Sequence, residues 1–306
     1  MEGDDRWVKV LPGALVCALL WGSAFPCLKT AYGIWESQGI ELGLRDYWWF
    51  AGVRFTIAGA ALLVVAKNPW AEIRQTSKKG LVVISLSQTF GQYLLFYLAV
   101  AVASGSLTGL LASTGSFWWV LLAPLMTRAP RPSRGQWVAL LLGGVGISLA
   151  TGAPGAGAGR PVLGALLMIG ATGLGAVGVI EFGKLGKGRG EGRGIGARAA
   201  TGFSLGAGGL MLLICGASTF PRAAELMTFP VILITCWLAF VSAAAFALWN
   251  YLSTKHPVPL LAGYRFLIPL CAVLLSVAFI DSEHLDWPAL LALLLVCLGI
   301  VLTSRE

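Results

Sequence analysis

Apolar residues gather in ten long blocks along the chain, and short polar stretches separate these blocks. A block of about 18 or more residues with few charges is long enough to cross the hydrocarbon core of a bilayer. In lipid, a helix satisfies its own backbone hydrogen bonds, so such blocks become helices. The pattern therefore predicts ten transmembrane helices, at residues 10–34, 47–66, 80–102, 105–126, 135–151, 162–183, 197–217, 228–253, 258–280 and 286–303.

The composition also favours an all-α integral membrane protein. Hydrophobic residues make up 57% of the 306 residues and charged residues 12%, whereas a soluble domain carries about 25% charged residues. The six cysteines lie singly among apolar residues and there are only two histidines. This spacing indicates neither a disulfide framework nor a metal site, and we expect no cofactor.

The basic residues fall mostly on one side of the predicted membrane. Fifteen lysines and arginines lie in the N-terminal segment, in alternate connections and near the C-terminus, and only Arg45, Arg160 and Arg222 lie in the opposite connections. Positive residues are retained on the cytoplasmic side, so we expect both termini of this multi-pass protein to face the cytoplasm across the cell membrane. The same rule explains the net charge of +8 without a nucleic-acid partner.

The two halves of the chain resemble each other weakly. GALV at 13–16, GVRF at 52–55 and YLLFYLA at 93–99 are echoed by GALL at 164–167, GARA at 196–199 and FALWNYL at 246–252, at offsets of 151, 144 and 153 residues. If each repeat has five helices, the second enters the membrane from the opposite side. Inverted repeats of this kind are typical of secondary transporters, with substrate bound near the midplane. The glycine-rich stretch at 183–196 is typical of a flexible linker between the halves.

Several motifs follow one another in a familiar order. LLWGSAF at 19–25 precedes Arg54-Phe55, and FALWNYL at 246–252 precedes YRFLIPL at 264–270, where we expect Pro269 in mid-helix. Glu283 and CLGIVL at 297–302 complete the series. In these motifs the chain resembles the drug/metabolite transporter superfamily, in its EamA branch, over essentially its whole length. The first half departs from the pattern, because Gly115 and Ala129 stand where the repeat would place Pro269 and Glu283.

The resemblance implies ten helices in two inverted five-helix repeats around a central cavity. The first repeat covers residues 1–152 and the second residues 162–306, and the intervening 153–196 includes a glycine-rich loop, the sixth helix and the midpoint linker. It implies a secondary transporter that exports a small metabolite, such as an amino acid or a related compound, by alternating access. Two alternatives remain open: a flippase-like protein for lipids or lipid-linked molecules, and a drug or nucleotide-sugar exchanger.

No enzyme is expected, because the chain has neither a nucleophile elbow nor a phosphate-binding P-loop. Proton-coupled carriers often use a carboxylate inside the membrane. Here no carboxylate falls in the middle of a predicted span, and Glu181, near a cytoplasmic end, can pair with Lys184. Coupling to protons and exchange against a counter-substrate therefore both remain open.

Polar and aromatic groups inside the spans are candidates for binding the substrate, because they are costly to place in lipid. Gln88 and Gln92 share a helix face, although they could equally join neighbouring helices. Arg265 could receive a carboxylate or phosphate, or extend to the cytoplasm, whereas Arg54 and Arg198 lie near helix starts and are expected to be structural. The predicted lining is Trp21, Gln88, Gln92, Tyr93, Trp118, Trp249, Asn250, Tyr264 and Arg265, with Gly22, Gly115 and Pro269 letting helices pack or bend.

Overall fold

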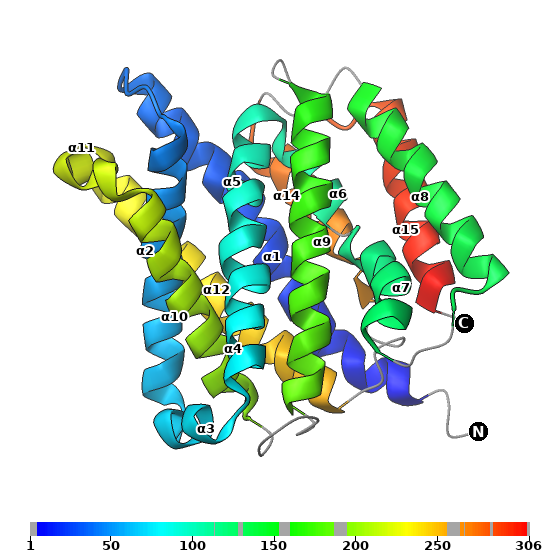
Figure 1. Cartoon of the computed structure of the whole chain (residues 1–306). Coiled ribbons are helices and arrows are strands. Elements are labelled where there is room, and N and C mark those ends of the chain that lie inside the picture. The colour runs from blue at the N-terminus through cyan, green and yellow to red at the C-terminus, as the bar shows by residue number, and fades with distance from the viewer. Residues whose placement is uncertain are drawn as a thin grey trace.

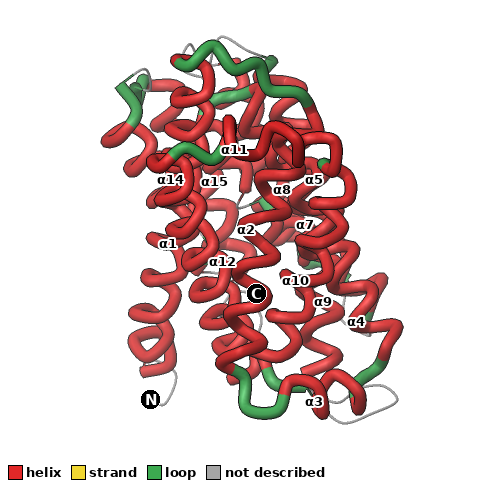
Figure 2. The backbone as a smooth tube through the Cα atoms, turned by 90° about the vertical axis from the view of Figure 1, so that its left-hand side faces the viewer, coloured by secondary structure: helices red, strands yellow, loops and turns green. Residues whose placement is uncertain are grey.

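The structure is a computed structural model that describes residues 5–112, 114–127, 131–152, 160–186, 195–255, 264–265, 267–281 and 284–304. Within these ranges the chain forms helices joined by turns and contains no strand (Figure 2). The predicted all-α membrane class is confirmed at this level, because seven helical stretches are long and apolar enough to cross a membrane. They are Val10–Ser37, Leu44–Val65, Lys78–Val102, Gly105–Met126, Pro161–Leu185, Ala197–Cys215 and Phe229–Leu252.

The helices follow the predicted apolar blocks. In chain order they are α1 (Asp5–Ser37), α2 (Leu44–Val65), α3 (Pro69–Gln75), α4 (Lys78–Ile84), η1 (Ser85–Gly91), α5 (Gln92–Val102), α6 (Gly105–Ala112), α7 (Gly115–Met126), α8 (Arg134–Gly152), α9 (Pro161–Gly186), α10 (Ala197–Cys215), η3 (Ala217–Arg222), α11 (Ala223–Leu226), α12 (Phe229–Lys255), α14 (Leu267–Phe279) and α15 (Trp287–Ser304). The three predicted blocks that are not among these seven stretches hold α8, α14 and α15, which have 19, 13 and 18 residues. The hydrophobic pattern does not predict α3, η3 and α11, which are too short to show a helical period.

The helices form one bundle with an apolar outer surface. Helices α2 and α10 pack together at one edge, and α8 packs against α15 at the other (Figure 1). Large apolar side chains remain on the outside, among them Val64, Leu125 and Ile214, which are 83%, 81% and 73% exposed. A soluble protein would not leave so much apolar surface in water, whereas a membrane protein presents it to lipid.

Two of the crossings are irregular near their middle. The crossing from α4 to α5 contains the π-helical segment η1, a rare form of helix that occurs frequently at functional sites. The next crossing is divided into α6 and α7, and Thr114 forms a turn just before α7. Both irregularities border the cavity described below.

Two residues lie elsewhere than the sequence predicts, and a third, Asp46, joins a helix from just outside the predicted span 47–66. Pro269 was expected in mid-helix but lies in the first turn of α14, where a helix needs no backbone donor. Arg54 lies in the middle of α2 and is 2% exposed, so its expected place near a helix start is wrong. Asp46 is a buried carboxylate in the first turn of α2, where Gly43 N–H and the Thr219 hydroxyl donate to it. The last two differences arise because α2 begins three residues earlier than predicted.

Other expectations are confirmed. A Cβ added to Gly22 would lie 2.9 Å from the Cβ of Cys271, so this glycine lets α1 and α14 approach closely. Glu181 pairs with Lys184 at 2.9 Å. Arg198 is the second residue of α10 and is exposed. Most of the predicted midpoint linker lies outside the described residues.

Glycines bring α2 and α10 into backbone contact. A Cβ added to Gly209 would lie 2.6 Å from the backbone nitrogen of Thr56, and one added to Gly59 would collide with the backbone of Gly206. Small residues allow such close approach, which provides the van der Waals packing that holds helices together in a membrane.

Replacing Gly59 with alanine should lower the stability of the protein by about 1–3 kcal/mol, because overpacking forces the two helices apart. Thermal unfolding of the purified protein in detergent measures this. Gly33→Ala is the matched control, because a Cβ there meets nothing within 4 Å; alanine should leave stability equal or higher there, since it favours helix more than glycine does. Equal melting temperatures for both variants would contradict the proposed contact.

Candidate functional site

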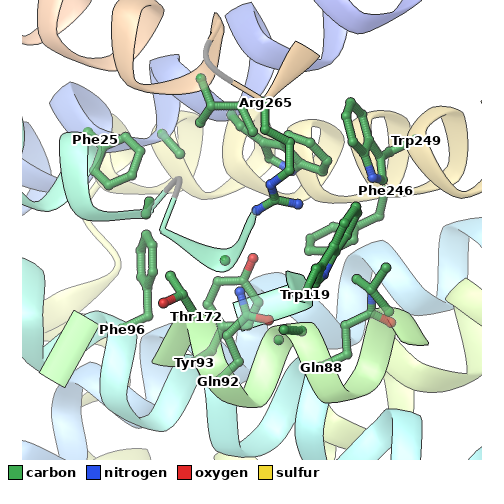
Figure 3. A pocket seen from close by; sticks show the side chains of 18 of the residues that line it. Phe25, Gln88, Gln92, Tyr93, Phe96, Trp119, Thr172, Phe246, Trp249 and Arg265 are labelled. Atoms are coloured by element: carbon green, nitrogen blue, oxygen red, sulfur yellow. The ribbon is translucent and has the colours of Figure 1, made fainter. Parts of the chain in front are cut away.

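A cavity of about 90 Å³ lies inside the bundle, between helices of the first and second halves (Figure 3). It is surrounded by residues from α1, α2, η1, α5, α6, α7, α9, α12 and α14. Aromatic, amide and guanidinium groups dominate its lining. The residues with large or polar side chains are Trp21, Phe25, Arg54, Gln88, Gln92, Tyr93, Phe96, Trp119, Thr172, Phe246, Trp249 and Arg265.

The two glutamines reach the cavity from η1 and from the first residue of α5. Neither amide side chain hydrogen-bonds to the described part of the chain, so both groups are available to a solute. Glycines of α9 hold this segment close: a Cβ at Gly178 would collide with Gln88, and one at Gly175 with the Gln92 amide. Small residues on α9 therefore create the room that the two amides occupy.

Arg54 is buried at the side of the cavity, and its Nε and Nη1 donate to neighbouring helices. Its Nε donates to the Leu238 carbonyl at 3.0 Å and to the Ser242 hydroxyl at 2.9 Å, both on α12. Its Nη1 donates to the Tyr97 hydroxyl at 3.1 Å, on α5. The guanidinium also lies 4.7 Å from the centre of the Phe55 ring. Arg54 thus links α2, α5 and α12, and sequence reasoning missed its place beside the cavity because it was assigned to a helix start.

Arg265 enters the cavity from the other side and has different surroundings. Its guanidinium carbon lies 5.0 Å from the Trp119 ring centre and 5.9 Å from that of Trp249. Its Nε is buried without a hydrogen-bond partner. In Figure 3 the guanidinium points into the cavity, on the side opposite Gln92 and Tyr93. The arginine therefore points into the cavity and not out of the bundle.

The remaining wall is aromatic. Trp21 contacts Phe246 and Trp249 with ring centres 5.5 Å apart in each case. Tyr93 packs on Phe246 at 6.4 Å. Such a wall offers flat apolar surface to a solute and excludes water around the charged groups.

Six of the nine predicted lining residues meet at this cavity: Trp21, Gln88, Gln92, Tyr93, Trp249 and Arg265. The other three lie beside it with other contacts. The Trp118 indole donates to the Ile169 carbonyl at 2.9 Å, and Asn250 donates to the Thr201 hydroxyl at 2.7 Å. Tyr264 is 4% exposed and packs in a neighbouring apolar cluster. These contacts join helices, which is the alternative role for polar groups in spans.

Sequence reasoning overlooked several lining residues. Trp119 faces the cavity where its neighbour Trp118 was expected, and it follows the lining residue Gly115 by four positions, a spacing that shares a helix face. Thr172 lines the cavity from α9 and its hydroxyl lies 3.0 Å from that of Thr114. None of the described residues around the cavity is acidic.

No family model matches the chain, and no curated protein matches it. Among solved structures, one described only as a crystal structure of a protein is similar over 97% of this chain and 98% of that chain. The TM-score is 0.65 and the sequences are 18% identical. At this identity the likeness concerns the fold alone, and it extends over nearly the full length of both chains.

Replacing Tyr97 with phenylalanine should destabilise the protein by about 1–3 kcal/mol, because it leaves Nη1 of the buried Arg54 without its acceptor. Chemical or thermal unfolding in detergent measures the loss. Tyr32→Phe provides the control: its hydroxyl is also buried but has no hydrogen-bond partner, so its removal should change stability little. A loss that is no larger for Tyr97→Phe than for Tyr32→Phe would contradict this role of Tyr97.

Proposed function

We propose that the protein is a secondary transporter that carries a small metabolite across the cell membrane by alternating access. The observation that carries this proposal is the cavity, where two guanidinium groups and two amides meet between helices of both halves. Polar and charged groups inside a membrane protein are costly and typically mark the path of a substrate or ion. In transporters built from repeats, such groups gather between the repeats.

The packing partners of the helices support an arrangement in two matched halves. The ten-helix reading pairs α1 with α9, α2 with α10, the α4–α5 crossing with α12, the α6–α7 crossing with α14, and α8 with α15. In the structure α1 packs against α12 and α14, while α9 packs against α5 and against α6 and α7. Likewise α2 packs against α12, while α10 packs against η1. Exchanging the halves therefore exchanges these contacts, as a two-fold relation requires.

The remaining contacts fit the same relation. Helix α2 packs on its counterpart α10, α8 on α15, and α6 on α14. When the two-fold axis passes between a helix and its counterpart, these two helices pack against each other in this way. We therefore infer two five-helix repeats, over residues 1–152 and 162–306. Because five is odd, they are inverted in the membrane, and the distribution of basic residues favours both termini in the cytoplasm.

The size of the cavity favours a small solute. A water molecule needs roughly 10–15 Å³ of cavity volume, so a cavity of about 90 Å³ has room for about six to nine waters. This suits an amino acid or a related metabolite, carried outward, better than the alternatives of a lipid with its acyl chains or a nucleotide sugar. The chain shows no motif for ATP hydrolysis, so movement would be driven by the gradient of the solute, a counter-substrate or protons.

The proposed topology can be tested with reporter fusions in a bacterial host. Alkaline phosphatase fused after Arg160 should be active, because this residue lies in a connection predicted to be outside, just before α9. Fusions after Lys79 and after Arg134 should be inactive and the corresponding fluorescent-protein fusions bright, because these positions lie among the basic residues expected in the cytoplasm. The reverse pattern of activity would refute the orientation, and active fusions on both sides would refute the number of spans.

Transport can be tested by counterflow into liposomes that contain the purified protein. Liposomes loaded with unlabelled phenylalanine, 3-phenylpropionate, uracil or glucose should take up the same labelled compound for at least one of these probes. Trp21→Ala should slow uptake by about tenfold or more, because it removes part of an aromatic wall worth roughly 1.5–3 kcal/mol. Trp70→Ala, on α3 and 62% exposed, should leave uptake unchanged.

Absence of counterflow for every probe, from protein that remains folded, would argue against this proposal. A scrambling assay with labelled lipids in the same liposomes would then examine the flippase alternative directly.

A further inference from the structure

The charges around the cavity do not balance. Arg54 and Arg265 both line it, and arginine remains protonated in proteins. None of the described lining residues is acidic. Within the described part of the chain, the ion pairs lie elsewhere: Lys184 with Glu181, and Arg222 with Asp46 and Glu225. The described part of the chain therefore presents two positive charges to one small space and no counter-charge beside them.

The two arginines differ in their hydrogen-bond partners within the protein. Arg54 already donates to a carbonyl and two hydroxyls on neighbouring helices. Arg265 donates to no described residue, and its Nε is buried without a partner. A buried donor without a partner costs free energy, and such groups in native proteins call for an explanation. Of the two guanidinium groups at the cavity, that of Arg265 is therefore the one whose donors have no partner among the described residues.

Two further features favour an anion at Arg265. Its Nη2 lies against the first residue of α7, where a Cβ added to Gly115 would come within 3.0 Å. The N-terminus of a helix carries partial positive charge, which makes this position unfavourable for a cation and favourable for an anion. Trp119 and Trp249 lie 5.0 and 5.9 Å from the guanidinium carbon, so they flank the group while leaving its donors free for a carboxylate.

The rest of the cavity fits the remainder of such a solute. Trp21, Phe246 and Tyr93 provide a flat apolar wall, and the amides of Gln88 and Gln92 can hydrogen-bond a polar substituent. An ammonium group has no acidic partner among the described lining residues, and it would share the space with two guanidiniums. A zwitterion should therefore be held less well than a plain anion.

We infer that the solute is a small organic carboxylate with an apolar, preferably aromatic, body, and that Arg265 receives its carboxylate in the cavity. This rests on the proposed transport function for its biological meaning. Binding itself can be measured without transport. The inference narrows the expected amino-acid class to compounds that carry a net negative charge.

The test is a binding series on the purified protein in detergent, by calorimetry and thermal shift. The probes share a phenyl group and differ in charge: 3-phenylpropionate, phenylalanine, 3-phenylpropionamide and 2-phenylethylamine. We expect 3-phenylpropionate to bind at least about tenfold more tightly than the amide or the amine, as hydrogen bonds to charged groups allow, and more tightly than phenylalanine. An affinity for the amide, the amine or phenylalanine that equals that for 3-phenylpropionate overturns the inference.

Variants test the role of Arg265 separately. Arg265→Gln should reduce affinity for 3-phenylpropionate about tenfold or more while leaving affinity for the amide unchanged, a difference that general disruption would not produce. Arg198→Gln removes the same charge from an exposed position on α10 and should change neither. Unchanged binding of 3-phenylpropionate to folded Arg265→Gln also overturns the inference. Should this variant fail to fold, the probe series on the unaltered protein decides alone.

The two proposals fail differently. Selective binding of 3-phenylpropionate without counterflow in liposomes would keep the carboxylate site and refute transport. Counterflow of phenylalanine that persists unchanged in Arg265→Gln would keep the transporter and refute the carboxylate site.

Discussion

A guanidinium ion in the middle of a membrane-embedded bundle must find its hydrogen-bond acceptors within the protein, because lipid offers none. Arg54 meets this constraint by donating hydrogen bonds to the Leu238 carbonyl and the Ser242 hydroxyl of α12 and to the Tyr97 hydroxyl of α5. Three helices from both halves of the chain are thereby tied to one charge at the side of the cavity. The cavity depends on this arrangement, because α2, α5 and α12 all contribute to its wall.

Small residues complement the buried charge by setting how closely the helices approach. Gly59 and Gly209 allow backbone contact between α2 and α10, and Gly22 does the same between α1 and α14. On α9, glycines face η1 and leave room for Gln88 and Gln92 beside the cavity. Where helices carry larger aromatic side chains, the backbones stay apart and a space remains. The placement of small residues at the close contacts and of aromatic residues around the cavity thus determines where the bundle is dense and where it is hollow.

Apolar block length was enough to predict the seven long apolar helices, because a membrane requires about twenty residues for each span. Polar residues inside those blocks pointed to the cavity, as Gln88, Gln92 and Arg265 show. Which of two adjacent tryptophans faces inward could not be predicted, since it depends on the rotation of α7 against α9. The roles of Asn250 and Arg54 could not be predicted either, because each depends on an acceptor far away in sequence. Asn250 donates to Thr201, and Arg54 donates to Ser242.

The contrast between the two arginines also bears on coupling. A cavity with an unpaired guanidinium is costly to close when empty, because closure removes water from a charge that has no acidic partner among the described lining residues. A carboxylate bound to Arg265 would bring the loaded cavity nearer to neutrality and lower that cost. The return of an empty carrier would then be slower than the return of a loaded one. This favours exchange of one anion for another over coupling to protons, and it follows from the position of a single charge between Trp119 and Trp249.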